Sequence, residues 1–277
     1  MPPPTERAPR QDDWTQLDAA GAAAAIAKLE ALGQSAGGTA ARARCLALLD
    51  LAPGQSVLDV GAGTGLASIE IARRVAPGGA VVGLEPSAPL RAFARAAADR
   101  SGVGPAIEWR EGRADALPFP DGRFDRAFCH WVLLHVEAAE ATLREMRRVT
   151  RRGGRVMCVE VDWETVTVHP AERDLARRIL HYSCDRHIEG WSGRRLPALL
   201  RACGLDDVSV EPIVLFDDGG EDQAWLRFLH QRGDMAAAAG AISRAEAAGW
   251  RERLDAAAVA GRLFFSVTQF AVRGSVR

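Results

Sequence analysis

Three glycines and one acid occur at spacings that could hold a nucleotide-type ligand. Gly61, Gly63 and Gly65 directly follow the apolar run Val57–Val60, and Glu85 ends a second apolar run 20 residues after Gly65. Glycines at a strand-to-helix turn permit positive φ and let a ligand approach the backbone, and the helix that follows offers free N–H groups. A carboxylate at the end of the second strand accepts hydrogen bonds from ribose hydroxyls. The pattern predicts a nucleotide-type cofactor site without choosing the cofactor.

The spacing of the glycines argues against a dinucleotide loop. Such a loop reads G-x-G-x-x-G/A, whereas this chain has Leu66 at the last position and its third glycine one place early. The pattern resembles motif I of class I S-adenosylmethionine (SAM) methyltransferases, which have no pyrophosphate to seat. The resemblance implies SAM as the cofactor. It also implies that the first turn and the end of the second strand bind it, through Asp59, Gly61, Ala62, Gly63, Thr64, Glu85 and Pro86.

A second motif lies in the third loop, where Gly112–Asp121 reads Gly-Arg-Ala-Asp-Ala-Leu-Pro-Phe-Pro-Asp. It resembles the adenine-binding loop of the ubiquinone/menaquinone-biosynthesis type of methyltransferase, usually Gly-Asp-Ala-Glu-x-Leu-Pro-Phe-Pro-Asp. Arg113 stands at the usual Asp or Asn position, and a guanidinium cannot accept a hydrogen bond from N6 of adenine. Two alternative contacts to adenine therefore remain possible. We favour the backbone of Arg113 and Ala114, and the rival is the carboxylate of Asp115.

The candidate catalytic residues follow the fourth and fifth predicted strands. The segment that begins with His130 and Trp131 lies, in the family, beside the methionine part of SAM and the reacting methyl, so both residues join the cofactor set. A base near the methyl would help transfer to a hydroxyl or amine, and histidine has a suitable pKa. His135 is the candidate base, with Glu160 or Asp162 as its partner. The alternatives are a helix-facing histidine and capping carboxylates. With a carbon nucleophile, these groups would only hold the substrate.

A parallel sheet would bring these residues to one edge, because ligands bind beyond the carboxyl ends of parallel strands. Apolar runs predict strands at 55–60, 80–84, 106–110, 124–129 and 155–161. Helical patterns predict helices at 65–76, after Ser87 and around 143–149, the last ending at Gly153-Gly154. The alternation predicts an α/β fold with a doubly wound, seven-stranded, mostly parallel sheet, which is the Rossmann-like fold of SAM methyltransferases. The resemblance covers about residues 45–162 and is vague beyond 163.

Beyond Asp162 the strand–helix rhythm changes. We predict helices at 170–187 and 196–203, a strand at 208–216, two helices within 221–258 broken at Gly233 and Gly240, and a strand at 264–272. The chain then divides into a disordered tail at 1–11, an N-terminal helical cap at 12–52, a SAM-binding core at 53–162, and a C-terminal part with substrate-lid helices at 163–277. Two cap helices, at 14–32 and 39–51, would lie across the cofactor mouth as in the family, or merely cover the sheet edge.

The composition restricts the partner classes. A net charge of −1 gives no strong field for nucleic acid, so we expect a small-molecule substrate and no nucleic-acid partner. Five cysteines without a C-x-x-C pair favour a reduced, cytoplasmic protein with no metal site. We expect neither a signal peptide nor a membrane span. The oligomeric state is not determined by the sequence, and a homodimer is possible.

Aromatic residues in the lid region could line an apolar acceptor pocket or simply pack the core: Trp163, Trp191, Trp225, Phe264 and Phe265. We therefore expect a methyltransferase (EC 2.1.1.-) for an apolar or aromatic metabolite, of specialised-metabolite or quinone-like type. The alternative is a SAM-fold protein without methyl transfer, such as a cyclase, an isomerase or a ligand-binding protein. An NAD-dependent dehydrogenase is the third and least favoured hypothesis.

Overall fold

A twisted sheet of parallel strands with one antiparallel insertion forms the centre of the protein. The computed structural model describes residues 19–186, 189–219 and 223–277, so the predicted tail and the start of the first cap helix lie outside it. In these residues seven strands form one sheet in the order β3-β2-β1-β4-β5-β7-β6. The strands are β1 Ser56–Val60, β2 Ala80–Leu84, β3 Ile107–Arg110, β4 Phe124–His130, β5 Thr150–His169, β6 Asp206–Asp218 and β7 Phe264–Ser275.

The direction of the strands confirms the predicted sheet. β1 to β5 pair in parallel, and β7 runs antiparallel to both β5 and β6. The register places Val60 level with Leu84 of β2 and with Cys129 of β4. Gly61, Glu85 and His130 therefore leave the sheet side by side at its carboxyl edge. Cys129 is level with Cys158 of β5, so Glu160 lies one residue further along the same edge.

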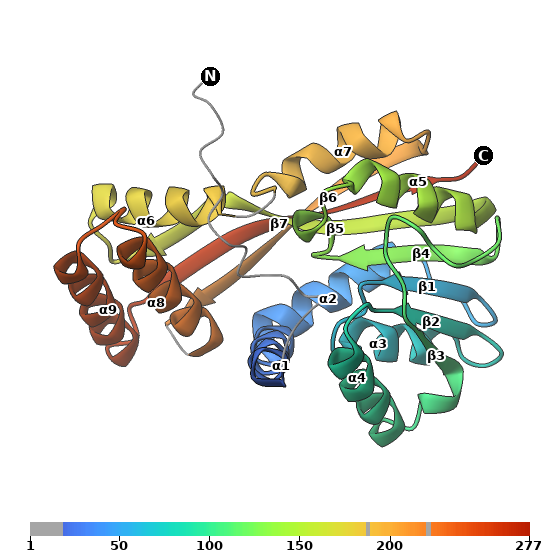
Figure 1. The fold of residues 1–277 in the computed structure, drawn as a ribbon, viewed down its shortest axis with the longest axis horizontal. Coiled ribbons are helices and arrows are strands. Elements are labelled where there is room, and N and C mark those ends of the chain that lie inside the picture. Colours follow the sequence, from blue (N-terminus) through green and yellow to red (C-terminus); the bar gives the residue numbers. More distant parts are fainter. Residues whose placement is uncertain (1–18, 187–188, 220–222) are drawn as a thin grey trace.

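Helices cover both faces of the sheet (Figure 1). One face carries α3 Leu66–Val75 and α4 Ala88–Arg100, and the other carries α5 Ala139–Val149 and α7 Ser192–Ala202. Two short 3-10 turns, η1 Gly104–Ala106 and η2 Leu133–His135, join elements of the parallel half. The buried side chains form one apolar cluster on each side of the sheet. This double cover is why the parallel strands read as nearly continuous apolar runs.

The two N-terminal helices follow each other more closely than the sequence predicts. α1 spans Ala19–Gln34 and α2 spans Ala36–Leu48, so the interruption is the single residue Ser35. The Ser35 hydroxyl accepts a hydrogen bond from the backbone N–H of Gly38, which satisfies one of the free donors at the start of α2. α1 contacts both α4 of the core and α8 of the C-terminal part. It therefore lies between these two parts of the protein (Figure 1).

The C-terminal strands run well beyond the parallel core. β5 continues through 20 residues, whereas the sequence predicts only 155–161. It already begins at Thr150, directly after α5, so the predicted helix end at Gly153-Gly154 is wrong. Past a register shift between Asp162 and Thr167, β5 still pairs with β7. This second stretch of pairing explains why the strand does not end where its continuously buried part ends.

A helical layer lies at the far end of these long strands (Figure 1). It consists of α6 Arg173–Asp185, α8 Gln223–Ala238 and α9 Arg244–Val259. The predicted break at Gly233 is wrong, because this residue lies inside α8. A Cβ at Gly233 would come within 2.8 Å of Cδ1 of Trp250 in α9. Glycine is needed there for close packing of two helices and not for a turn.

Candidate functional site

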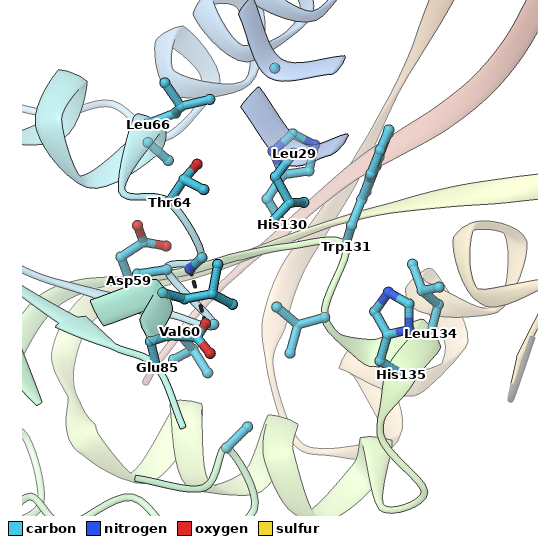
Figure 2. A pocket seen from close by; sticks show the side chains of 18 of the residues that line it. Leu29, Asp59, Val60, Thr64, Leu66, Glu85, His130, Trp131, Leu134 and His135 are labelled. Atoms are coloured by element: carbon cyan, nitrogen blue, oxygen red, sulfur yellow. Dashed lines mark hydrogen bonds between the residues drawn. The ribbon is translucent and has the colours of Figure 1, made fainter. Parts of the chain in front are cut away.

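A cavity of about 820 Å³ opens at the carboxyl edge of the parallel strands. The glycine turn, the third loop, the segment after β4 and helix α8 line it, together with residues of both N-terminal helices. In Figure 2, Asp59 and Glu85 lie on one side of the cavity, and Trp131 and His135 lie on the other. Ligand sites in proteins usually measure about 300–1,000 Å³, so this cavity has the size of a small-molecule site.

The glycine turn gives the cavity a bare backbone wall. Gly61 and Gly63 have φ values of 69° and 56°, a region that residues with a side chain rarely adopt. A Cβ on Gly61 would meet Cγ2 of Val132 at 2.5 Å, so the turn packs tightly against the segment after β4. A Cβ on Gly63 would instead have Leu29, at 3.7 Å, as its nearest neighbour. A Cβ there would make only ordinary van der Waals contacts, and Gly63 lines the cavity, so its backbone is accessible to a ligand.

Glu85 fixes this turn from the end of β2. Its Oε2 accepts a hydrogen bond of 3.0 Å from the backbone N–H of Gly63, which Figure 2 shows as a dashed line. Its Oε1 accepts one of the same length from the N–H of Ser87. Burial raises the pKa of Glu85, and these two N–H donors partly offset that effect. The carboxylate keeps lone pairs for further donors, such as hydroxyl groups of a ligand.

A second buried acid lies beneath the turn. Oδ2 of Asp59 accepts a hydrogen bond of 2.6 Å from the hydroxyl of Ser68, in the first turns of α3. Burial raises the pKa of Asp59 to about 7, the Ser68 hydroxyl lowers it in part, and the nearby Glu85 raises it further. Asp59 and Glu85 both line the cavity, so this end is suited to the positively charged part of a ligand.

The third loop contributes an internal ion pair. Nε and Nη2 of Arg113 donate to the two carboxylate oxygens of Asp115 at 2.9 and 2.7 Å. The Arg113 guanidinium lowers the pKa of the Asp115 carboxyl. Arg113, Ala114 and Asp115 all line the cavity, as does Pro86 after β2. The fork occupies one lone pair on each oxygen of Asp115, so the carboxylate and the backbone of the loop both remain candidate contacts for a flat ring.

The residues at the end of β4 are held by a glutamine that belongs to no sequence motif. Oε1 of Gln269, on β7, lies 2.9 Å from Nε1 of Trp131 and 3.1 Å from Nε2 of His130. Nε2 of Gln269 donates to Sγ of Cys45 in α2 at 3.7 Å. Trp131 has a φ of 57°, which is unusual for a non-glycine residue. Burial lowers the pKa of His130 to about 4, so its ring is neutral near pH 7.

The candidate catalytic acids Glu160 and Asp162 have different hydrogen-bond partners. Oε1 of Glu160 accepts from the backbone N–H groups of Val132 and Leu133 at 2.8 and 2.7 Å, and Oε2 accepts from Leu134 at 3.3 Å. Glu160 therefore caps the short η2 turn that ends at His135. Burial raises the pKa of Glu160 to about 7, and these N–H donors lower it in part.

Asp162 is engaged by a different partner. Both of its oxygens accept hydrogen bonds from the guanidinium of Arg194 in α7, and its Oδ1 also accepts from the N–H of Glu164. Its side chain is almost fully buried, so this ion pair fastens α7 to β5. His135 lines the cavity, but Glu160 and Asp162 do not. The hydrogen bonds of the two acids indicate that they position backbone rather than the His135 ring.

The part of the cavity formed by the C-terminal elements is aromatic. Trp163, Trp225 and Phe228 line it, with Leu215 and Arg232. Trp163 stacks on Phe228 with ring centroids 5.2 Å apart, and Trp225 stacks on Phe265 at 4.4 Å. Phe265 lies in the core behind Trp225 and is not a lining residue. The other two aromatic candidates are not lining residues either: Trp191 is 47% exposed and Phe264 is 38% exposed.

Several lining residues were missed by the sequence-based prediction. They are Lys28 and Leu29 of α1, Arg42 of α2, Arg232 of α8 and Gln269 of β7. None belongs to a motif, and each reaches the cavity from an element distant in the chain. α1 and α2 do contribute to the mouth, as the resemblance implied. Among the described residues no cluster of three or more His, Cys, Asp or Glu side chains could hold a metal ion.

Comparison with known proteins links this cavity to a domain family. Residues 58–158 match the family model described as a methyltransferase domain. An uncharacterized 37.1 kDa protein in a transposon of Streptomyces fradiae is 32% identical over 227 residues, which is 81% of this chain and 63% of that protein. A ubiquinone/menaquinone biosynthesis C-methyltransferase, UbiE, of Hahella chejuensis is 39% identical over 107 residues, which is 39% of this chain and 43% of that protein. The chain spans about half the length of the curated relatives it matches.

Solved structures share the fold at low identity. Phosphoethanolamine N-methyltransferase 2 of Haemonchus contortus, in complex with S-adenosyl-L-methionine, has a TM-score of 0.60 and 16% identity, covering 96% of this chain and 59% of that chain. The cyclase SpnF has a TM-score of 0.54 and 22% identity, covering 88% of this chain and 84% of that chain. A likeness at these identities shows the fold alone.

Proposed function

Because residues 58–158 form a methyltransferase domain of the class I, ubiquinone/menaquinone-biosynthesis-like type, we propose that this protein is a SAM-dependent methyltransferase for a small, apolar or aromatic metabolite. The resemblance predicted from the sequence is confirmed, as is S-adenosyl-L-methionine as the cofactor of this family. The acceptor is the new part of the proposal. A quinone-like metabolite is the class that the relatives' printed names favour, and a specialised metabolite is the other acceptor class that we propose.

One observation supports the proposal most strongly. The Gly63 backbone lines the cavity and is held by Glu85, and the same cavity continues to an aromatic wall. The first feature suits a nucleoside bearing an amino acid, and the second suits an apolar acceptor. Both occur in one cavity, so the two reactants could be held next to each other. Holding reactants in line is worth about 7–11 kcal/mol of the barrier for well-oriented partners.

We assign the parts of the cofactor site as follows. The turn Gly61–Thr64, with Asp59 beneath it, would hold the methionine part, and Glu85 would bind the ribose hydroxyls. The third loop would hold adenine. We favour the Arg113–Ala114 backbone as the adenine contact, and the rival is the Asp115 carboxylate, whose charge is paired with Arg113.

Bound SAM would supply an electrophilic methyl group to the acceptor. His135, which lines the cavity, is the candidate to take the proton that a hydroxyl or amine acceptor loses. Glu160 and Asp162 act in this proposal as positioning residues. Glu160 holds the backbone of the turn that carries His135, and Asp162 fixes α7 against β5. His130 is a weaker candidate base, because burial lowers its pKa to about 4.

A small molecule, rather than nucleic acid, is the proposed partner, and a homodimer stays a proposal. All five cysteines are free and buried, which fits a reducing compartment, so a cytoplasmic location is part of the proposal. No helix within the described ranges is both long and apolar enough to cross a membrane. We also keep the four-part domain division as a proposal, in which the helices after 163 form a lid.

The second candidate is a SAM-fold protein that does not transfer methyl. It is favoured by one observation: Glu160 and Asp162, the two acids predicted to support His135, instead accept hydrogen bonds from backbone N–H groups and from Arg194. SpnF, a cyclase, shares the fold. The two candidates predict the same binding of S-adenosylhomocysteine and differ in turnover.

The test separates binding from chemistry. Calorimetric titration with S-adenosylhomocysteine measures the cofactor site, and incubation with methyl-labelled SAM and a panel of aromatic acceptors measures transfer. Label transferred in step with S-adenosylhomocysteine formation would support the methyltransferase. Tight binding with conversion of an acceptor but no label transfer would support the second candidate. A thermal shift with NAD but not with S-adenosylhomocysteine would overturn both.

A further inference from the structure

Helix α8 presents one row of side chains to the cavity. Trp225, Phe228 and Arg232 are spaced by three and four residues, so they lie on one face of the helix. All three line the cavity. α8 lies on the side of the molecule away from β1 and β2, whose ends carry Asp59 and Glu85 (Figure 1). The row therefore belongs to the acceptor part of the cavity and not to the cofactor part.

The row ends in a buried charge. Arg232 is only 5% exposed. Its guanidinium carbon lies 4.3 Å from the centre of the Phe228 ring, and its Nη1 lies 3.7 Å from Sδ of Met235. Phe228 in turn stacks on Trp163. The guanidinium thus continues an aromatic wall, and what remains of its exposed surface faces the cavity that it lines.

An arginine in this position has a chemical consequence. A guanidinium stays charged throughout the pH range in which proteins are folded. Its five N–H donors form a planar fork that matches the oxygens of a carboxylate or phosphate. Five donors also suffice to bind a ligand oxyanion in addition to contacts within the protein. The same plane stacks on aromatic rings, as it does here on Phe228.

We propose that the acceptor of this enzyme carries an oxyanion, a carboxylate or phosphate, on a flat apolar body, and that Arg232 binds the oxyanion while Trp163 and Phe228 contact the body. The inference rests on the proposed function and narrows its substrate class. The cavity then has the acids Asp59 and Glu85 at its cofactor end, beside the paired Arg113, and Arg232 on its aromatic wall. Such an arrangement orients a cationic cofactor and an anionic acceptor in opposite senses.

The test uses three probes of one shape on the full-length protein saturated with S-adenosylhomocysteine. Naphthoate, naphthyl phosphate and the neutral naphthamide are titrated by ligand-observed NMR. For wild type we expect at least one anion to bind about tenfold or more tightly than naphthamide, since a charged hydrogen-bonded pair is worth that much. Which anion gains identifies the oxyanion as carboxylate or phosphate.

Two variants assign the effect to Arg232. Arg232→Gln should lose the preference for the anion and keep its affinity for S-adenosylhomocysteine, whereas Arg232→Lys should keep part of the preference. Arg227→Gln removes an exposed arginine from the same helix and should behave as wild type. The wild-type comparison of anions with naphthamide stands even if a variant does not fold.

The outcomes are distinct from those for the proposed function. Equal binding of naphthamide and both anions to wild type would overturn the inference, as would an anion preference that persists in folded Arg232→Gln. The probes are also titrated without S-adenosylhomocysteine. Failure of S-adenosylhomocysteine to bind would therefore count against the proposed function, while the anion preference would still be measured by the same criterion.

Discussion

The side-chain oxygen of Gln269 lies 2.9 Å from Nε1 of Trp131. An indole N–H can only donate, so the glutamine atom at this place is the oxygen and not the nitrogen. The same oxygen lies 3.1 Å from Nε2 of His130, which must therefore carry a proton and donate. Nδ1 of His130 is then the ring nitrogen with the free lone pair. A single buried amide thus fixes both the tautomer of His130 and the orientation of Trp131.

Replacing this amide should disturb both residues at once. Gln269→Leu leaves the donors of His130 and Trp131 without their acceptor inside the protein. We expect the free energy of unfolding to fall by about 1–3 kcal/mol, as measured by urea titration, because unsatisfied buried donors cost that much. Affinity for S-adenosylhomocysteine should also fall, since both residues line the cavity. The exposed control Gln223→Leu should change neither, and an unaltered Gln269→Leu protein would show that the shared oxygen is dispensable.

Gly63 should tolerate no side chain while cofactor binds. Gly63→Val places two methyl groups in the space that its backbone borders, and we expect S-adenosylhomocysteine binding to be lost in calorimetry. Gly102 provides a matched control: its φ of 72° is also positive, and a Cβ there meets nothing within 4 Å. Gly102→Val carries the same kind of backbone strain without reaching the cavity. It should bind normally, and equal loss in both variants would attribute the effect to strain alone.

Glu85 should contribute to cofactor affinity in two ways. Its carboxylate is the proposed ribose acceptor, and it holds the Gly63 N–H in place. Glu85→Ala should weaken S-adenosylhomocysteine binding by about 1–3 kcal/mol, the range for a lost charged hydrogen bond. Glu85→Gln keeps one acceptor oxygen and should lose less. Glu108→Ala, an exposed change on the adjacent strand β3, serves as control. If Glu85→Ala binds with wild-type affinity, the ribose assignment is wrong.

The sequence predicted the cofactor half of the site because that half is local. Asp59 lies near the end of β1 and the turn Gly61–Gly65 follows directly, so neighbouring residues of one short segment build this part of the site. The register of the parallel strands determines the positions of the other residues. It brings Glu85 and His130 beside Gly61, whatever the conformation of the connecting loops. The predicted strand 80–84 agrees with β2 to the residue.

The acceptor half was predicted poorly because it depends on long-range packing. Gln269 and Arg232 reach the cavity from elements more than a hundred residues beyond the glycine turn, with no motif around them. Gly233 was interpreted as a helix break because glycine weakens helices, but its role is to admit Trp250 of the next helix. β5 was predicted too short because its last residues gain their structure from pairing with β7, which the local pattern does not reveal.

His135 should affect turnover more than binding if it is the base. His135→Ala is expected to lower kcat about 100-fold, the lower range for general-base catalysis, with affinity for S-adenosylhomocysteine nearly unchanged. His169→Ala, an exposed histidine at the end of β5, should keep wild-type turnover. Steady-state assays with labelled SAM and an active acceptor measure both. Turnover at the wild-type rate in His135→Ala would assign the ring to packing or to acceptor binding.

Asp59 should make the cofactor-free protein less stable as the pH rises. Burial raises its pKa from 3.8 to about 7, so between these values the folded state holds a proton that the unfolded state has released. Unfolding then releases a proton, and stability falls with increasing pH across this window. One unit of pKa difference corresponds to about 1.4 kcal/mol, so the loss is on the order of a few kcal/mol.

The Asp59→Asn variant isolates this contribution. Asparagine still accepts from the Ser68 hydroxyl but has no charge to bury. Glu160 titrates with the same sign as Asp59, and His130, whose pKa is lowered, with the opposite sign. Both contributions cancel in the difference between wild type and variant. Urea unfolding at pH 4 to 7 should show that wild type loses stability relative to Asp59→Asn as the pH rises. The exposed control Asp174→Asn should show a constant difference from wild type, and a constant difference for Asp59→Asn would mean that this carboxyl ionises normally in the folded protein.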